Sequence, residues 1–290
     1  MTVMATLSLS GDAGCHVILA SLHEKLLGLL EPHELAFCQI LKDSRDIPDH
    51  VDLTLVEGSV RTENDRERLR EARARAKILV AIGSCACFGG IQSLCNFVDS
   101  QELMKETYGA AIAEAKSLGK NLPEVLPKNI PVREIVEVDF QIPGCPPEPD
   151  EVASCLGAIL RGETPQLSQK NVCDECKKKR GGDFEAKIRR LTEKPSDLER
   201  CLLELGYICM GPATRAGCHA KCVAANVPCD GCRGPADLKY DQGVAMLDAL
   251  IAADRETVST YSVATMSAMY HRYSFATSVL AKLLERKDRR

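Results

Sequence analysis

The chain has 290 residues, of which 45% are hydrophobic and 27% are charged, so it is long enough for one large or two modest globular domains. Its net charge of −4 at pH 7 argues against a general nucleic-acid-binding protein, and no window of about 18 apolar residues predicts a membrane span. The N-terminus lacks a basic region followed by an apolar one, so we expect a cytoplasmic protein.

The first part of the chain alternates short apolar runs with helical patterns. Residues 2–9 predict a strand, residues 17–30 have helical periodicity, and residues 34–40 predict a second, weaker strand. Runs of mostly branched apolar residues at 51–56 and 77–82 are typical of strands buried on both faces, as in a parallel sheet.

A charged segment at 62–76 lies between these two runs and predicts a surface helix that turns Leu69, Ala72 and Ala76 inward. Residues 134–142 predict a fifth strand, and residues 148–160 predict another helix. Strand and helix therefore alternate, which predicts an α/β fold with a doubly wound parallel sheet.

Thiol and carboxylate side chains follow four of the predicted strands. Asp12 and Cys15 follow the first strand, and Glu57 follows the third. Cys85 in "GSCACFGG" follows the fourth, and Cys145 in "PGCPP" follows the fifth. Because ligands bind beyond the carboxyl ends of the strands in such sheets, we expect three thiols and one carboxylate to converge there. A thiolate-rich set of four favours zinc or an iron–sulfur cluster. We interpret the other cysteines of this region as packing residues: Cys38, Cys87, Cys95 and Cys155.

The remaining eight cysteines crowd into residues 173–232. This change in density places a domain boundary near residues 161–171, so we expect domains of 1–165 and 166–290. Eight thiols divide into two sets of four, and four thiolates are what a 4Fe–4S cluster requires. Zinc is the alternative, because Cys₄ zinc sites use the same closely paired cysteines. The basic run at 177–182 is interpreted as a solvated segment, and two amphipathic patterns beyond residue 241 predict C-terminal helices.

Three long motifs resemble those of the small, iron–sulfur subunit of nickel–iron hydrogenases: "VAIGSCACFGG", "PGCPP" and "CLLELGYICMGPAT…C…PCDGC". Within that family the chain is most similar to the cytosolic, methyl-viologen-reducing branch that supplies heterodisulfide reductase in methanogens. The resemblance covers roughly residues 5–240. It implies a flavodoxin-like domain with a proximal cluster, followed by a small irregular domain with medial and distal clusters.

The resemblance also implies what the chain does. It implies an electron-transfer subunit with three 4Fe–4S clusters and no catalytic site of its own. Its partners would be a large subunit that holds the nickel–iron centre, a small iron–sulfur adaptor subunit and heterodisulfide reductase.

Ligands are assigned by matching this chain to the family motifs residue by residue. The proximal ligands are Cys15, Cys85 and Cys145. The distal set is Cys173, Cys176, Cys201 and Cys209, and the medial set is Cys218, Cys222, Cys229 and Cys232. Many members have a histidine in place of Cys173, and many have no counterpart of Cys222. Both sets therefore predict 4Fe–4S clusters.

The first proximal motif of the family is Cys-x-x-Cys, and Asp12 occupies the place of its first cysteine. We interpret Asp12 as the fourth proximal ligand; the alternative is that it only caps the helix that begins near His16. His16 and His219 each adjoin a ligand and are expected to donate hydrogen bonds rather than to bind metal. Glu57 is expected to shape the charge of the proximal site, to relay protons, or to cap a turn.

Three alternatives stay open. The Asp12 substitution is compatible with a related electron-relay subunit that has a different electron donor. A deazaflavin-reducing relative would carry a compact C-x₂-C-x₂-C-x₃-C-P run, which is absent here. A zinc-stabilised binding module is the third alternative.

Overall fold

The computed structural model describes residues 2–109, 111, 123–185, 188–237, 240–253 and 268–288. The chain divides into two compact units: unit 1 is Met1–Pro165 with Tyr273–Arg290, and unit 2 is Gln166–Arg272. Within the described ranges, no helix combines the length and the apolar character needed to cross a membrane.

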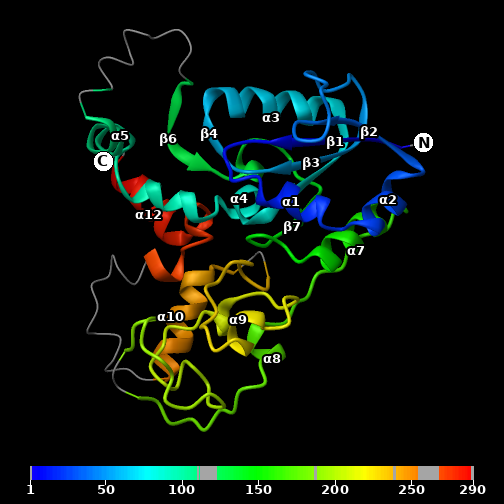
Figure 1. The fold of residues 1–290 in the computed structure, drawn as a ribbon. Helices are drawn as coiled ribbons and strands as arrows, with labels where there is room; N and C mark the ends of the chain where they lie inside the picture. The colour runs from blue at the N-terminus through cyan, green and yellow to red at the C-terminus, as the bar shows by residue number, and fades with distance from the viewer. Residues whose placement is uncertain are drawn as a thin grey trace. The chain divides into compact units, whose positions relative to one another are not determined.

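Unit 1 is built on a five-stranded sheet in the order β2-β1-β3-β5-β7, and all four neighbouring pairs are parallel (Figure 1). The strands are β1 (Thr2–Ser8), β2 (His33–Cys38), β3 (Val51–Glu57), β5 (Ala76–Ile82) and β7 (Phe140–Ile142). The predicted α/β fold with a parallel sheet is confirmed. Because the strands are parallel, their carboxyl ends share one edge of the sheet.

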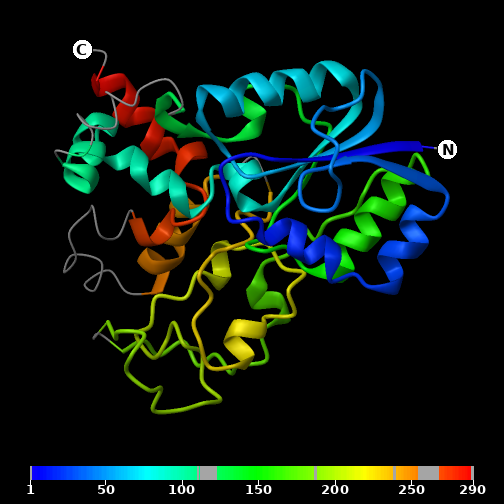
Figure 2. The same cartoon turned by 45° about the horizontal axis from the view of Figure 1, so that its top comes forward.

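Helices cover both faces of this sheet. Helix α3 (Glu63–Arg75) lies on one face, and α1 (Gly14–Ala20), α2 (Glu24–Leu30) and α7 (Pro149–Leu160) lie on the other (Figures 1 and 2). Side chains of a strand alternate between the two faces.

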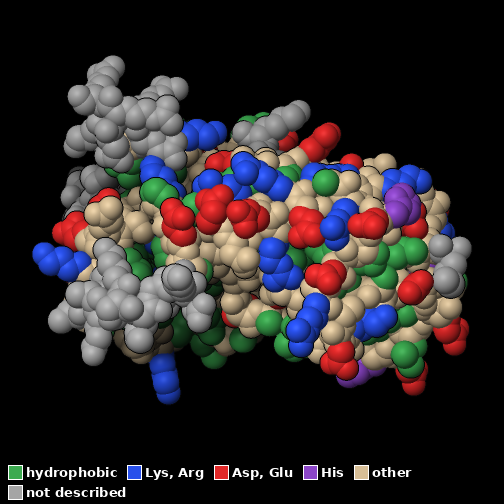
Figure 3. All heavy atoms as spheres, turned by 90° about the horizontal axis from the view of Figure 1, so that it is seen from above, with side chains coloured by type: hydrophobic (Ala, Val, Ile, Leu, Met, Phe, Trp, Pro, Cys, Tyr) green, Lys and Arg blue, Asp and Glu red, His purple; other side chains and the backbone are tan. Residues whose placement is uncertain are grey.

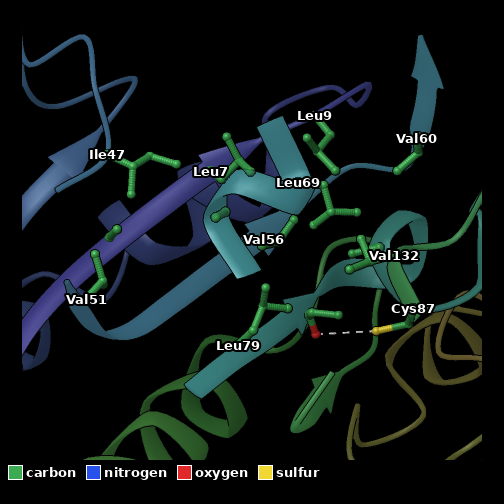
Figure 4. Packing of buried hydrophobic residues seen from close by; sticks show 14 of the residues in the cluster. Leu7, Leu9, Ile47, Val51, Val56, Val60, Leu69, Leu79, Cys87 and Val132 are labelled. Carbon is green, nitrogen blue, oxygen red and sulfur yellow. Dashed lines mark hydrogen bonds between the residues drawn. The ribbon is translucent and has the colours of Figure 1, made fainter. Parts of the chain in front are cut away.

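The α3 face forms the main core of unit 1. Leu7, Val56 and Leu79 come from three neighbouring strands and pack with Leu69 of α3 (Figure 4). All four side chains are fully buried. Burying each of them contributes about 1.5–3 kcal/mol.

Helix α3 begins and ends where its sequence predicts. The Asp65 amide donates to the Thr62 hydroxyl at 3.1 Å, and the Thr62 amide donates to Asp65 Oδ2 at 2.9 Å, which forms a capping box. Acidic residues in the first turn and Arg73 and Arg75 in the last turn complement the helix dipole. Acidic and basic side chains are interspersed on the surface seen from above (Figure 3).

Several details of unit 1 differ from the predictions. The helical pattern at 17–30 forms two helices, α1 and α2, because the chain breaks around His23, whose φ is +49°. The strand predicted at 134–142 is reduced to β7, because residue 134 ends the 3₁₀ turn η2 (Val132–Glu134) and residues 135–139 run through a turn and bends.

Unit 1 also contains elements that were not predicted. Strand β4 (Val60–Thr62) pairs with β6 (Val125–Ile130) in a separate antiparallel ribbon. Between β5 and β6 lie α4 (Gly83–Phe88), η1 (Ile91–Phe97) and α5 (Ser100–Tyr108).

Unit 2 has little regular structure (Figure 2). Its described part contains α8 (Val172–Glu175), η3 (Gly211–Ala213), α9 (Lys221–Ala224) and α10 (Gln242–Ala253), with no named strand. A small core that includes Leu205, Tyr207, Met210 and Met246 also contains Cys209 and Cys229. The ligand candidates of unit 2 are therefore part of its packing.

The C-terminal residues pack with unit 1, which differs from the predicted second domain of 166–290. They form η5 (Phe275–Thr277) and α12 (Val279–Asp288). The Phe275 ring is fully buried and stacks on Phe97 of η1, with ring centroids 3.9 Å apart. This aromatic contact explains why residues 273–290 associate with unit 1.

Candidate metal centres

The three proximal cysteines lie at the carboxyl edge of the unit 1 sheet. Cys15 is in the first turn of α1, Cys85 is in α4, and Cys145 lies between β7 and α7. The Ser84 amide donates to the Gly144 carbonyl at 2.8 Å, which ties the second of these segments to the third.

Two glycines allow the backbone to approach these thiols closely. Gly83 has a φ of +85°, and a Cβ atom there would collide with Cys15 Sγ. A Cβ atom at Gly90 would lie 2.5 Å from Cys85 Sγ. Only glycine fits at these positions without a shift of the structure, so the backbone is shaped around the sulfur atoms.

The three thiols lie near one another, since Cys85 and Cys145 contribute to the raised pKa of Cys15 and Cys145 contributes to that of Cys85. Burial raises the pKa of Cys85 to about 12, with further contributions from Cys145, Asp12 and Glu57. Burial also raises the pKa of Cys15, and Glu57 and Cys85 add to the shift. Burial and then Asp12 raise the pKa of Cys145. Thiolates in such a site are unfavourable unless a cation neutralises them, and a coordinating metal keeps thiols deprotonated. This donor set therefore fits an iron–sulfur cluster.

Asp12 lies in the turn before α1 and near two of the thiols. Its Oδ1 atom accepts a hydrogen bond from the Gly14 amide at 2.9 Å, a local turn contact just before α1, whose N-cap residue is Ala13 and which has no side-chain cap. The same carboxylate raises the pKa values of Cys85 and Cys145, so it also lies near two thiols. The side chain is exposed.

Glu57 and His16 form a buried pair beside this site. Glu57 Oε1 accepts from the Ser8 hydroxyl at 2.8 Å and lies 2.6 Å from His16 Nδ1. His16 Nδ1 lacks the angle of a hydrogen bond, so the contact is an ion pair when the ring is protonated. His16 Nε2 lies 2.9 Å from the Thr6 hydroxyl. Burial raises the pKa of Glu57, but the contacts with His16 and Ser8 outweigh it and leave that pKa lowered.

In unit 2, the four predicted distal cysteines surround one cavity of about 140 Å³: Cys173, Cys176, Cys201 and Cys209. Burial raises the pKa of Cys173 to about 12; Arg180 lowers it, and the other three thiols raise it. A Cβ atom at Gly211 would lie 3.1 Å from Cys173 Sγ and 3.6 Å from Cys209 Sγ.

Backbone amides point at the sulfur of Cys209. The Cys229 amide donates to Cys209 Sγ at 3.3 Å. Burial raises the pKa of Cys209, and the amides of Gly211 and Cys229 lower it. Hydrogen bonds to sulfur are one means by which proteins tune iron–sulfur clusters, so this donor set also fits such a group.

The four predicted medial cysteines are brought together less completely. Burial raises the pKa of Cys229, and Cys209 and Cys232 contribute, so these three thiols are neighbours. Cys218 packs against the core cluster that contains Cys229. Cys222 is exposed, whereas Cys229 is buried and Cys218 and Cys232 are half-buried. His219, with a φ of +56°, lines a surface groove.

Two further polar residues lie beside these cysteines and were not identified from the sequence. The Thr214 hydroxyl donates to the Met210 carbonyl at 2.6 Å and lowers the pKa of Cys229, which burial raises. Arg180 donates to the Cys173 carbonyl at 3.1 Å. Both belong to segments already singled out, "MGPAT" and the basic run, but spacing alone does not show that they face thiols.

All fifteen cysteines lie within the described residues, and none forms a disulfide. In this part of the chain, no group of three histidine, cysteine, aspartate or glutamate side chains is arranged to hold a single metal ion. The predicted packing cysteines Cys38, Cys87 and Cys155 are buried. Cys87 donates to the Ala81 carbonyl at 3.5 Å (Figure 4).

Comparisons with known proteins agree with this architecture. Residues 13–159 match the family described as NADH ubiquinone oxidoreductase, 20 Kd subunit. A subunit of the vhu F420-non-reducing hydrogenase of Methanocaldococcus jannaschii is 41% identical, over 85% of this chain and 86% of that protein. The iron-sulfur subunit of the F420-non-reducing hydrogenase of Archaeoglobus profundus is 32% identical, over 97% of this chain and 98% of that protein.

A solved chain of an NAD+-reducing NiFe-hydrogenase in the H2-reduced state has a similar fold. It is 32% identical, with a TM-score of 0.50, and the match covers 57% of this chain and 94% of that chain. The parallel sheet with cysteines at its edge is thus that of an oxidoreductase subunit of the hydrogenase type. The chain belongs to the family of hydrogenase small subunits that includes the iron-sulfur subunit of the F420-non-reducing hydrogenases, as its motifs predicted. It is therefore one component of a hydrogenase complex.

Proposed function

We propose that this chain carries electrons in a cytoplasmic hydrogenase, from a nickel–iron large subunit towards heterodisulfide reductase by way of a small iron–sulfur adaptor subunit. The observation that carries the proposal is the convergence of Cys173, Cys176, Cys201 and Cys209 around one cavity. Four thiols that line one cavity form a donor set for a 4Fe–4S cluster, and burial raises the pKa values of two of them, Cys173 and Cys209. When bound, three such clusters supply one-electron transfer from the proximal through the medial to the distal position.

The residues of the chain have defined tasks in this proposal. Asp12, Cys15, Cys85 and Cys145 hold the proximal cluster, and Cys218, Cys222, Cys229 and Cys232 hold the medial one. Gly83, Gly90 and Gly211 leave room beside the sulfur atoms. Glu57 and His16 place a buried carboxylate–imidazole pair next to Cys15, with Glu57 Oε1 2.6 Å from His16 Nδ1. None of these residues acts as a nucleophile or as a general base.

The composition of the purified complex tests the proposal. Anaerobic purification with the large subunit should yield about twelve acid-labile sulfide and about thirteen iron per chain, twelve in three 4Fe–4S clusters and one in the nickel–iron centre. The complex should reduce methyl viologen with hydrogen. A colourless preparation that contains zinc and no sulfide would refute the proposal and support the zinc-stabilised module. Iron–sulfur clusters without nickel in the complex would support the alternative of a different electron donor, which the Asp12 substitution motivates.

The role of Asp12 has its own test. The Asp12→Asn variant keeps an oxygen that accepts from the Gly14 amide, so α1 should begin as before, but it removes the carboxylate charge. If Asp12 binds iron, the electron paramagnetic resonance signal of the proximal cluster changes. Asp12→Cys is the matched control, because it restores the Cys-x-x-Cys pair and should give a conventional four-cysteine signal. An unchanged signal in Asp12→Asn would leave Asp12 with its turn contact alone.

A further inference from the structure

A buried glutamine begins helix α10 of unit 2. Gln242 is 2% exposed, and it lies outside the cysteine motifs. Burying an amide side chain is unfavourable unless it makes hydrogen bonds. Asp241, the residue before it, accepts from the Val244 amide at 2.9 Å and lies 3.1 Å from His271 Nε2. These contacts anchor the first turn of α10, so they hold Gln242 in place.

The hydrogen bonds of Gln242 determine which way its amide group faces. The Nε2 atom donates to the Gly231 carbonyl at 2.9 Å and to Thr214 Oγ1 at 3.2 Å. A carbonyl can only accept, so the nitrogen must face Gly231, and the second hydrogen of the same group then points to Thr214. A Cβ atom at Gly231, whose φ is +88°, would lie 3.1 Å from this Nε2 atom. The loop of Gly231 therefore closes tightly on the glutamine amide.

This arrangement limits where the Thr214 hydroxyl sends its proton. A hydroxyl group has one proton to donate, and Thr214 already accepts from Gln242. Its proton is shared between the Met210 carbonyl, 2.6 Å from Oγ1, and the sulfur of Cys229. Thr214 is fully buried, so bulk water does not compete for this proton. An ionised acceptor forms the stronger hydrogen bond, so a metal-bound Cys229 thiolate draws the proton towards itself.

The surroundings of Cys229 suit a thiolate. Burial raises the pKa of this thiol and Cys209 adds to the shift, whereas hydrogen bonds from the Gly231 backbone and the Thr214 side chain lower it. Hydrogen-bond donors that face a buried sulfur stabilise its ionised form. Both donors to Cys229 are themselves held by Gln242, one through the Gly231 carbonyl and the other through the Thr214 hydroxyl.

We propose that Gln242 is a positioning residue that holds the Thr214 hydroxyl as a donor to the Cys229 sulfur and so raises the reduction potential of the cluster that Cys229 binds. The inference rests on the proposed function, because it takes Cys229 as a ligand of the medial cluster. A hydrogen bond to a ligand sulfur stabilises the reduced cluster more than the oxidised one, since the reduced cluster carries more negative charge. Gln242 acts through Thr214, so removing either side chain should lower the same potential.

Redox titration of the whole hydrogenase complex, followed by electron paramagnetic resonance, tests this inference. Gln242→Met keeps an unbranched side chain of similar length and removes both donated hydrogen bonds. Gln242→Asn is the second variant in case the first one loses iron, because it keeps an amide but is too short to reach both acceptors. The matched control is Met246→Leu, which changes another fully buried side chain of α10 at nearly constant volume.

Both Gln242 variants should shift the midpoint potential of one cluster to a more negative value, and Met246→Leu should not. Thr214→Val, which replaces the hydroxyl by a methyl group, should shift the same cluster in the same direction, and Thr214→Ser should keep the wild-type value. Adding Gln242→Met to Thr214→Val should cause little further shift. Such non-additivity is expected only if the glutamine acts through the hydroxyl.

An unchanged potential in the Gln242 variants would overturn the inference, and so would a full further shift when Gln242→Met is added to Thr214→Val. Equal shifts in Gln242→Met and Met246→Leu would reduce the glutamine to a packing residue of α10 and would also overturn it. Failure of the proposed function is distinguishable from these outcomes. In that case the wild-type complex itself would contain no acid-labile sulfide, and the inference would fail with it.

Discussion

Replacing Gly83 by alanine should remove the proximal cluster while leaving the sheet intact. Gly83 begins α4 and has a φ of +85°, a conformation that favours glycine. An added Cβ atom would collide with Cys15 Sγ, and the Gly144 carbonyl lies 3.6 Å away on the other side. The thiol therefore has to move, and a ligand that moves no longer fits a cluster held by three other groups.

Gly162 provides a control that separates backbone strain from this collision. It follows α7 with a φ of +77°, and an added Cβ atom would meet nothing within 4 Å. Gly162→Ala should therefore cost about 1–2 kcal/mol of unfolding free energy, which is the cost of a left-handed conformation alone. Gly83→Ala carries the same cost and the displacement of Cys15 in addition.

Iron and sulfide analysis with denaturant unfolding measures both effects. Gly162→Ala should keep all of its iron, whereas Gly83→Ala should lose roughly the share of one 4Fe–4S cluster out of three. If Gly83→Ala matches Gly162→Ala in both iron content and unfolding free energy, the collision with Cys15 has no consequence and the placement of the proximal site is wrong.

Three other predictions concern the cysteines. Cys87→Ala should lower the unfolding free energy by about 1 kcal/mol through lost packing and leave the iron content unchanged. Cys85→Ala, two residues away, should lose iron. Equal iron loss in both variants would contradict the assignment of Cys85 as a ligand and Cys87 as a packing residue. The Cys222→Ser variant should fold normally, because this side chain is exposed. It should hold a three-iron medial cluster, which has its own electron paramagnetic resonance signal. An unchanged signal would show that Cys222 is not a ligand. Removing iron with a chelator should abolish amide hydrogen-exchange protection in unit 2 and preserve it in β1, β3 and β5 of unit 1. If amide protection is retained in both units, the clusters do not stabilise the fold of unit 2.

The sheet could be predicted because its strands are buried on both faces. Such strands must be apolar along their whole length, so the runs at 51–56 and 77–82 match β3 (Val51–Glu57) and β5 (Ala76–Ile82) to within one residue at each end. The inward positions of Leu69 and Ala72 in α3 follow from helical periodicity in the same way, and both are fully buried.

Elements that depend on contacts between residues far apart in the sequence are harder to predict from the sequence. Strand β6 contains Pro127 and Lys128, which are unusual in a strand, and it is stabilised by pairing with β4 more than sixty residues earlier. The break between α1 and α2 falls at His23, inside a continuous helical pattern of apolar residues. Local propensity favours one helix there, so the break reflects the tertiary structure.

The candidate sites also contain features that the sequence predicts and features that it does not. Topology predicts that Cys15, Cys85 and Cys145 share an edge, because they follow parallel strands. The pairing of His16 with Glu57 joins positions 41 residues apart, and no local pattern predicts it. Asp12 contacts the Gly14 amide in the turn before α1 rather than capping the helix, and its assignment as a proximal ligand stays a prediction.

The two units should depend on metal to different degrees, since they bury different kinds of side chain. Unit 1 has a core of aliphatic residues between sheet and helix, and that core includes none of its proposed ligands. Unit 2 has short helices, and Cys209 and Cys229 lie inside its only described hydrophobic cluster. Their pKa values are raised by burial, so without iron they remain neutral thiols around a cavity of about 140 Å³ at the distal position. Iron converts those thiols to bound thiolates and fills that space, so the free energy of binding becomes part of the folding free energy of unit 2.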